Sequence, residues 1–405
     1  MSTLKVMQVG IGGYGEAYLK PMLENLPNDR WELVGVVDPM ADKSSLFSQI
    51  VEKGVPVFSS IEEFYTDASA DLVIIAAPIS FHRFYTVFAL EHGSNVLCEK
   101  PIAATMRDAE AMREAEQRFG KFVAIGFQWS FSDAMLAAKQ DYLNGKFGKP
   151  VQFKTHVLWA RGWNYYARNN WAGRFRDRQG NWVLDSVAHN ATAHYLHSQY
   201  FMQGAALDRS AQPLTLQAEL HRANDIENFD TCALRAVMDT GCEVLYYASH
   251  AVDRHDEPVF EYRYERATLR YNGGSDAPRN RLIASYPDGT TWDYGSPDPG
   301  TYGKLMACLD AIESGKPVPC GIDTAMPHLF TINYLADYVP IHVFPKETVM
   351  LDSANQRTYV PGLAEALLQC YASGKLPSES GFPWAAPAPV MQTAGYKGFP
   401  VSHGR

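Results

Sequence analysis

A glycine-rich turn near the start of the chain has the residue types and the spacing that suit a phosphate group. It is a G-x-G-x-x-G pattern, Gly10-Ile11-Gly12-Gly13-Tyr14-Gly15. Gly10 permits a tight turn, Gly12 lets the backbone come close to a pyrophosphate, and Gly15 lets the next helix pack against the strand. The N–H groups at the start of that helix favour the anionic phosphates. We therefore expect a dinucleotide site formed by Gly10, Gly12, Gly13, Tyr14 and Gly15; the alternative is a structural turn without a ligand.

An acidic residue that suits an adenosine ribose ends the next apolar run. Asp38 directly follows Val36-Val37, close to the separation of about 20 residues from the glycine turn that such a carboxylate has in dinucleotide-binding folds. Its negative charge would repel the 2′-phosphate of NADP, and no Arg follows within Pro39-Met40-Ala41-Asp42. The sequence therefore favours NAD over NADP as the cofactor.

A lysine stands before a proline in Cys98-Glu99-Lys100-Pro101, at the end of a run that we expect to be a strand. In an open parallel sheet, the residues just past the carboxyl ends of the strands line the ligand crevice. Pro101 restricts Lys100 to extended conformations, which would aim its side chain. Lys100 there suits a hydrogen bond to a substrate hydroxyl and assistance in its deprotonation. The alternative is a surface lysine before a turn proline.

An aspartate and a histidine further on have the spacing of a helical pair. If Asp185 begins a helix, as Asp often does, Asp185 and His189 share one face. A neighbouring carboxylate raises the basicity of an imidazole and fixes its tautomer, which suits proton abstraction near neutrality. The alternative is an N-cap Asp beside an unrelated buried His. His194 and His197 follow, but their spacing matches no common zinc site, so we expect no metal.

The stretch 159–182, which precedes this pair, is rich in aromatic and basic residues. Aromatic faces pack against sugar rings, and Arg side chains bind hydroxyls or an acidic substituent, so a sugar acid or another anionic glycoside would fit. The alternative is that these aromatics pack between domains or subunits while the arginines pair with surface acids. The residues that we expect to contact a substrate are Lys100, Gln128, Arg161, Trp163, Tyr166, Arg168 and His189.

The glycine turn and Lys100 lie in a region where strand-like and helix-like segments alternate. We expect strands at 4–9, 32–37, 57–58, 71–77, 95–99 and 122–127, and helices that include 17–26 and 106–117. This alternation predicts an α/β fold with a doubly wound parallel sheet, the Rossmann type. We place this dinucleotide-binding domain at 1–127.

From residue 151 onward, strand-like runs are joined by turn residues. They lie at 151–159, 214–221, 229–238, 243–249, 259–264, 267–271, 281–286 and 290–294, and helix candidates follow at 303–314 and 324–338. We therefore expect a second domain at 128–350 with a largely antiparallel sheet. The Pro/Gly-rich extension, 351–405, is expected to be irregular and to lie on the surface.

Composition excludes several classes of partner. The 405 residues carry 36 Lys and Arg against 45 Asp and Glu, a formal net charge of −9, which argues against nucleic acid or an anionic membrane. An apolar run of about 18 residues, as a membrane span needs, does not occur. The start of the chain does not resemble a signal peptide, and the six cysteines form no CxxC pair, so we expect reduced thiols and a cytoplasmic location.

Five features occur together in this chain and in this order: the glycine turn, Asp38, the segment Pro78 to His82, the Glu99-Lys100-Pro101 turn and the Asp185/His189 pair. In this combination they resemble the Gfo/Idh/MocA family. This family comprises relatives of glucose–fructose oxidoreductase and inositol dehydrogenase. The resemblance covers roughly residues 4–345. It implies a Rossmann domain followed by an α/β domain, here 128–350, that binds substrate. The open, mostly antiparallel sheet of such a domain covers the active site and often mediates dimers or tetramers.

The resemblance also implies roles for individual residues. Lys100 corresponds to the family's catalytic lysine, and Asp185 and His189 to its helical pair, with the histidine as the acid/base. Pro78, His82, Glu99 and Lys100 join the cofactor-binding residues.

The sequence departs from the family pattern in three places, which indicates a divergent subgroup. Val187 and Thr192 replace a Gly and a second Asp on the catalytic helix. The run 126–133 has neither the usual Arg nor the usual Pro, and the extension after about residue 350 has no obvious counterpart. The first two departures leave the proton-transfer groups in place but bear on substrate identity.

By resemblance, the expected activity is transfer of hydride between NAD and a hydroxyl-bearing carbon of a sugar, sugar acid or cyclitol. A second hypothesis is cleavage of a glycosidic bond by transient oxidation and elimination, with no net change of the NAD. A third is a non-enzymatic sensor of sugars or dinucleotides, against which the retention of Lys100, Asp185 and His189 argues.

Overall fold

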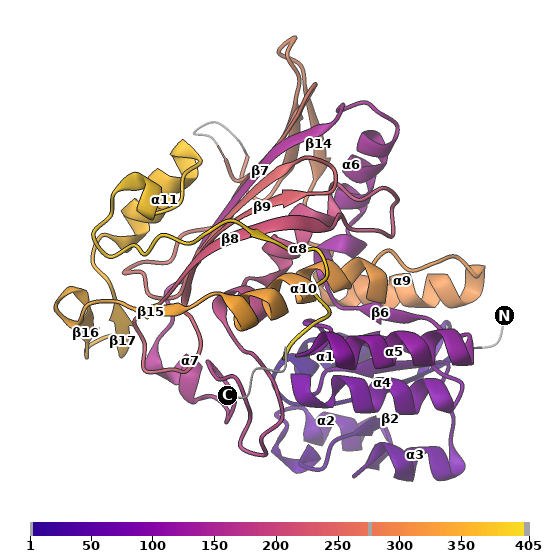
Figure 1. The fold of residues 1–405 in the computed structure, drawn as a ribbon. Coiled ribbons are helices and arrows are strands. Elements are labelled where there is room, and N and C mark those ends of the chain that lie inside the picture. The colour runs from indigo at the N-terminus through magenta and orange to yellow at the C-terminus, as the bar shows by residue number, and fades with distance from the viewer. Residues whose placement is uncertain (1–2, 274–277, 401–405) are drawn as a thin grey trace. The chain divides into compact units, whose positions relative to one another are not determined.

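The computed structural model describes residues 3–273 and 278–400, which form two compact units (Figure 1). Unit 1 comprises the chain up to Ala103, together with Arg107–Phe131 and Asp298–Met326, and unit 2 comprises Ala104–Met106, Ser132–Pro297 and the chain from Pro327. The sequence-based domains, 1–127, 128–350 and 351–405, are continuous segments, whereas each unit is assembled from separate stretches.

Six parallel strands form the sheet of unit 1, in the order β3-β2-β1-β4-β5-β6. They are β1 (Leu4–Val9), β2 (Trp31–Val37), β3 (Val57–Phe58), β4 (Leu72–Ile75), β5 (Asn95–Cys98) and β6 (Val123–Ile125). All four residues of β4 are buried, as expected for a central strand covered on both faces. This order is that of the doubly wound dinucleotide-binding fold, in which ligands bind where the order reverses, between β1 and β4. The predicted Rossmann fold is confirmed.

The helices of unit 1 follow its strands, with one exception. They are α1 (Glu16–Glu24), α2 (Phe47–Glu52), α3 (Ile61–Asp67), α4 (His82–Glu91), α5 (Met106–Phe119) and α9 (Gly300–Ser314). Helix α9 comes far later in the chain, yet it packs beside α1 and β5. Its face toward them includes Lys304, Leu305 and Cys308, all buried.

Ten strands form the main sheet of unit 2. Along the path β14-β13-β12-β11-β7-β10-β9-β8-β15, only the pairs β7–β10 and β8–β15 are parallel, and β18 also pairs with β8. The strands are β7 (Pro150–Leu158), β8 (Pro213–Arg222), β9 (Thr231–Met238), β10 (Glu243–Ser249), β11 (Val259–Tyr264), β12 (Thr268–Tyr271), β13 (Leu282–Ser285), β14 (Thr291–Gly295), β15 (Ile341–Val343) and β18 (Met391–Gln392). The predicted mostly antiparallel sheet is confirmed.

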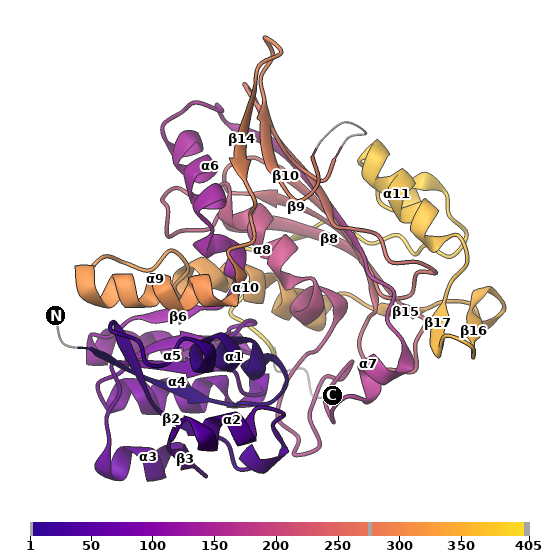
Figure 2. The same cartoon turned by 180° about the vertical axis from the view of Figure 1, so that it is seen from behind.

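Helices of unit 2 cover both faces of this sheet. Helices α6 (Asp133–Leu143), α8 (Ala193–Phe201) and α11 (Leu363–Ser373) contact its strands. Unit 2 also contains α7 (Trp163–Ala167) and the part of α10 (Ile322–Tyr338) from Pro327 onward. On β10, Tyr246 bonds to Thr192 next to α8, whereas Leu245 and Tyr247 pack with α11. Because successive residues of a strand point to opposite faces, α8 and α11 lie on opposite sides of the sheet, as Figures 1 and 2 show.

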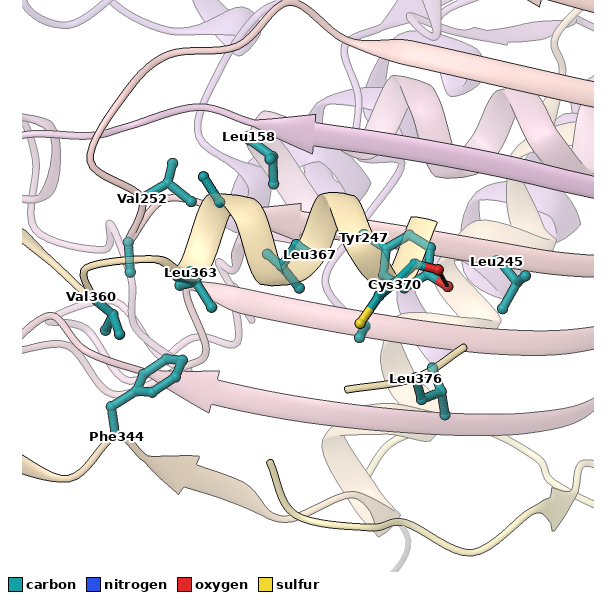
Figure 3. Packing of buried hydrophobic residues seen from close by; sticks show 13 residues of the cluster. Leu158, Leu245, Tyr247, Val252, Phe344, Val360, Leu363, Leu367, Cys370 and Leu376 are labelled. Carbon is teal, nitrogen blue, oxygen red and sulfur yellow. Dashed lines mark hydrogen bonds between the residues drawn. The ribbon is translucent and has the colours of Figure 1, made fainter. Parts of the chain in front are cut away.

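The expectation of an irregular surface extension after residue 350 is wrong. The extension forms a hairpin of β16 (Met350–Asp352) and β17 (Arg357–Tyr359), followed by α11. Leu363, Leu367 and Cys370 of α11 are buried against β7, β9 and β10 in one apolar cluster (Figure 3). Burial of this apolar face stabilises α11, although Pro/Gly-rich segments flank the helix.

In the part of the chain that the structure describes, no helix is long and apolar enough to span a lipid bilayer.

Candidate active site

The glycine turn connects β1 to α1, and two of its glycines are required by the fold. Gly10 has φ +80°, and a Cβ there would lie 2.7 Å from the carbonyl oxygen of Ala76. A Cβ at Gly15 would collide with the Gly10 carbonyl. At Gly12, in contrast, φ is −97° and nothing lies within 4 Å of an added Cβ. The open space beside Gly12 therefore fits a ligand that approaches the backbone closely, as a dinucleotide pyrophosphate does.

Asp38 lies at the end of β2, directly beside this turn. Its carboxylate accepts hydrogen bonds from the Ile11 N–H (3.1 Å) and the Met40 N–H (2.8 Å), and the residue is half-buried. The first of these bonds fixes the carboxylate against the glycine turn. This is the place and charge that a ribose diol requires, so the residues present fit NAD.

The Lys100 turn lies just past the carboxyl end of β5. Lys100 is half-buried, the Lys100–Pro101 peptide bond is cis, and the Lys100 N–H donates to Glu99 Oε2 (3.1 Å). His82 lies behind the turn and is only 1% exposed. Its Nδ1 lies 2.9 Å from the Pro101 oxygen and its Nε2 lies 2.9 Å from the Ala77 oxygen. His82 therefore ties the end of β4 to the lysine turn.

Burial decides the protonation of His82, because it lowers the pKa of the imidazole although the surrounding carbonyls act in the opposite sense. Glu99 is also buried, at 5% exposure, whereas Pro78 is exposed after β4. We expected all three residues to bind the cofactor. In the structure, His82 and Glu99 support the turn from inside.

Gln128 stands in the short helical turn Gln128–Phe131, after β6. Its Oε1 accepts from the Tyr14 hydroxyl (3.2 Å) and its Nε2 donates to Asp298 (3.0 Å). We expected Gln128 to contact substrate and Tyr14 to contact the cofactor. The structure links these two side chains to each other at the mouth of the glycine turn.

Asp185 and His189 are close in space, but the predicted helix beginning at Asp185 is wrong. Leu184 has φ +48°, and Ser186 is the N-cap of a single π-turn, Val187–Ala191. The Ser186 hydroxyl accepts from the His189 N–H (3.2 Å). Since Ser caps as well as Asp does, the helix begins one residue later and Asp185 stays in the loop.

The Asp185 carboxylate holds this loop together. It accepts from the Gly173 N–H (2.6 Å) and from the Asn190 side-chain amide (2.8 Å), and Asp185 is 2% exposed. Asp185 thereby fastens the stretch before it to the π-turn that carries His189.

The His189 imidazole is oriented by a backbone carbonyl. Its Nδ1 lies 3.0 Å from the Leu184 oxygen, and a carbonyl only accepts, so Nδ1 carries the proton and Nε2 presents its lone pair. The His328 ring stacks on it with centroids 6.0 Å apart, and His328 Nε2 bonds to the Ala188 oxygen (3.0 Å). Nε2 of His189 is therefore the atom that can take a proton.

The aromatic stretch 159–182 divides into two groups. Trp163 and Trp182 pack within unit 2, where Trp163 Nε1 donates to Thr358 (3.0 Å) and the Trp182 ring lies 4.7 Å from Phe399. Both rings thus have packing partners within unit 2, and the substrate contact expected of Trp163 stays a prediction.

The other group surrounds Asp185. The Arg161 guanidinium carbon lies 4.8 Å from the centroid of the Tyr165 ring, and the Arg168 guanidinium carbon lies 3.7 Å from the same centroid. Burial first, and then the Asp185 charge, raise the pKa of Tyr165. Tyr166 next to it lines a cavity of about 540 Å³ with Asn169, Arg174, Arg178, Asp225 and Glu227. This polar cavity thus borders the stretch that the Asp185 carboxylate binds through the Gly173 N–H.

Sequence reasoning missed two residues. Tyr18 and Lys304 bind the Glu99 carboxylate, and both side chains are fully buried. Tyr18 lies on α1 and Lys304 on α9, so no local spacing connects either of them with Glu99. Within residues 3–273 and 278–400, no group of three or more His, Cys, Asp or Glu side chains is placed to hold a metal ion.

Comparison with known proteins assigns the first unit. Residues 4–127 match the family described as oxidoreductase family, NAD-binding Rossmann fold, GFO_IDH_MocA. The chain is 30% identical over 150 residues to inositol 2-dehydrogenase of Salmonella typhimurium and 29% identical over 147 residues to the NAD-dependent scyllo-inositol 2-dehydrogenase of Bacillus subtilis. These matches cover 37% and 36% of this chain and 44% and 42% of the relatives, so the chain spans less than half of their length.

Solved structures share the fold over most of the chain. The WlbA dehydrogenase of Bordetella pertussis, solved with NADH and UDP-GlcNAcA, has a TM-score of 0.65 at 19% identity and covers 82% of this chain and 94% of its own. Aldose–aldose oxidoreductase of Caulobacter crescentus has a TM-score of 0.66 at 18% identity, covering 82% and 96%. Unit 1 is therefore an NAD-binding Rossmann domain. Residues 4–127 are thus similar to the Rossmann domain of the Gfo/Idh/MocA oxidoreductases, and the solved structures extend the likeness in fold to most of the chain.

Proposed function

We propose that this protein is an NAD-dependent dehydrogenase that acts on a hydroxyl-bearing carbon of a sugar, sugar acid or cyclitol. The observation that carries the proposal is the buried His189 imidazole, whose Nδ1 is held by the Leu184 carbonyl, so that Nε2 is the basic atom of the neutral ring. It stands in a chain that also has a glycine turn fitted to a dinucleotide and Lys100 at the carboxyl edge of the same sheet. The relatives named for inositol oxidation and the WlbA structure with a UDP-sugar acid support this substrate class.

In the proposed reaction, His189 and Lys100 act on one substrate hydroxyl. Nε2 of His189 takes the hydroxyl proton, and the Lys100 ammonium donates a hydrogen bond to the same oxygen as negative charge develops on it. NAD, when bound, supplies the acceptor for the hydride that leaves the carbinol carbon. Asp185 holds the loop that carries His189, and Arg161 and Arg168 on the neighbouring stretch would bind hydroxyls or an acidic group of the substrate.

The carboxylate of Asp38 favours NAD over NADP in this proposal. Asp38 is already bonded to the glycine turn, and the 2′-phosphate of NADP would bring a second negative charge to the same place. We expect tighter binding of NAD than of NADP, and the Asp38→Ser variant to reduce that preference.

A substrate panel tests the proposal. The purified protein is incubated with NAD and with sugars, sugar acids and cyclitols, myo-inositol and scyllo-inositol among them, while the absorbance of reduced nicotinamide is followed. We expect sustained NADH formation with at least one member. Product formation without net NADH would instead support glycoside cleavage through transient oxidation, and absence of turnover with the whole panel would contradict the proposal.

We further propose that the protein works in the cytoplasm as a homodimer or homotetramer. All six cysteines are free thiols and buried, which suits a reducing compartment. Light scattering at micromolar concentration tests the assembly, and a monomer there would contradict it.

A further inference from the structure

A buried lysine lies beneath the Lys100 turn. Lys304 of α9 is 0% exposed, and its ammonium forms an ion pair with Glu99 Oε1. A charged lysine withdrawn from water requires a partner of opposite charge, and Glu99 is that partner. Glu99, the residue directly before the proposed catalytic lysine, is thus paired with a residue of α9 that lies 205 positions later in the chain.

The Glu99 carboxylate joins three separate elements. Oε1 also accepts from the Tyr18 hydroxyl of α1 (2.6 Å), and Oε2 accepts from the backbone N–H of Lys100 (3.1 Å). Burial, followed by the Glu99 charge, raises the pKa of Tyr18 well above its usual value, so this phenol remains a donor. The carboxylate therefore connects α9, α1 and the lysine turn through charge-assisted hydrogen bonds.

A glycine leaves room for the Glu99 carboxylate at this position. A Cβ at Gly126 would lie 2.6 Å from Glu99 Oε1, so only glycine leaves room for the ion pair. The carbonyl oxygen of Gly126 also faces the Lys304 ammonium at 3.4 Å.

The same lysine touches the helix that follows the glycine turn. Its Nζ lies 4.8 Å from the Tyr18 ring centroid and 5.3 Å from that of Tyr14, and the two rings pack edge to face. Lys304 therefore contacts both the turn that would hold NAD and, through Glu99, the turn that carries Lys100.

We propose that Lys304 is a positioning residue: through Glu99, it fixes the Lys100 turn to the glycine turn. The link holds the backbone of Lys100 in place while its side chain acts. This role rests on the proposed function of Lys100 but not on the identity of the substrate.

Hydrogen–deuterium exchange of the full-length protein, without ligand, tests the proposal on the Lys100 amide, which Glu99 holds. Lys304→Met should speed exchange in a peptide spanning Cys98 to Ala103 by at least about tenfold. The matched control is Lys139→Met, since Lys139 is also fully buried and donates to the oxygens of Leu207 (3.1 Å) and Arg209 (2.6 Å) in unit 2. Equal exchange of this peptide in the two variants would overturn the proposal.

A second variant keeps the test decisive if Lys304→Met does not fold. The double variant Glu99→Gln/Lys304→Met removes both charges together, which buried sites tolerate better than loss of one partner. One amide oxygen cannot replace the two carboxylate oxygens that serve Tyr18 and Lys100, so we expect a folded protein whose Lys100 amide still exchanges faster. Wild-type protection of that amide would overturn the proposal.

Kinetics with myo-inositol, or with the panel member that is turned over, separate this proposal from the proposed function. Lys304→Met should lower kcat by about tenfold to a hundredfold and leave KM within about threefold, since misplacement of a catalytic group acts mainly on the chemical step. In a Lys100→Ala background it should have no further effect on kcat. If Lys100→Ala itself retains activity, the proposed function fails; if it does not and Lys304→Met is fully active, only the positioning role fails.

Discussion

The Lys100 turn and the His189 loop are held in different ways. The lysine turn depends on the side chains of Glu99, Tyr18 and Lys304, which come from three distant parts of the chain. The imidazole of His189 stacks on the His328 ring, but the Leu184 carbonyl and the Ser186 cap that orient its loop lie within five residues of it. The first arrangement is therefore sensitive to single remote side chains, whereas the second is built into the local backbone.

The largest expected effect is common to both regions and tests whether each carries a reacting group. Lys100→Met and His189→Asn should each lower kcat by about 10²–10⁴-fold, the contribution typical of a positioned proton-transfer group, with little change in thermal unfolding. Steady-state kinetics with the panel substrate measure this. Lys149→Met on the surface is the control and should match wild type; a variant of Lys100 or His189 with wild-type kcat would remove that residue from the mechanism.

The next largest effect is the loss of stability that acid causes through buried histidines. Burial lowers the pKa of His156 to about 4, of His221 to about 4 and of His250 to about 3, all in unit 2. Between pH 6.5 and about 4, the unfolded chain binds protons at these positions and the folded chain does not, so stability falls as the pH falls. The loss approaches about 1.4 kcal/mol per pH unit for each histidine.

Chemical denaturation at a series of pH values checks whether the free energy of unfolding falls as the pH falls. We expect stability to decrease steadily below pH 6.5, and His250→Gln to make the decrease shallower by about one proton. An unchanged slope in His250→Gln would show that this histidine does not remain neutral in the folded state.

Two substitutions in the glycine turn, at Gly12 and at Gly15, separate ligand binding from stability. Gly12→Ala should leave thermal unfolding unchanged, because open space surrounds the new Cβ, yet weaken NAD binding by about tenfold through contact with the pyrophosphate. Gly15→Ala should destabilise the fold, because its Cβ collides with the Gly10 carbonyl. Calorimetric titration with NAD measures the affinity, and wild-type affinity in folded Gly12→Ala would contradict the ligand placement.

The smallest expected effect tests the local support of His189. Ser186→Ala removes one cap bond and should cost about 1 kcal/mol of stability. Because the Leu184 carbonyl still orients the imidazole, kcat should stay within about threefold of wild type. A loss of kcat as large as that of Lys304→Met would mean that the two regions do not differ as described.

The sequence was sufficient where structure is local. The strands, the glycine turn and Asp38 were predicted because each depends on neighbours in the chain or on the spacing of one strand–helix unit. The helix start was misplaced at Asp185 because Asp and Ser are equally good caps, and the choice depends on the bonds that Asp185 makes with Gly173 and Asn190.

Two other features show what the sequence contains and what it lacks. Helix α11 had a signal, since Leu363, Leu367 and Cys370 recur at helical spacing, but the surrounding Pro and Gly residues obscured it. Lys304 had none. Its role follows from the return of α9 to unit 1, which no local pattern indicates.

The structure of the protein with NADH and the sugar or cyclitol that gives turnover tests the central claim most directly. We expect one substrate oxygen within about 2.6–3.2 Å of both the Lys100 Nζ and the His189 Nε2. A substrate bound with its oxidised carbon beside the nicotinamide, but with either nitrogen beyond hydrogen-bond reach, would contradict the account.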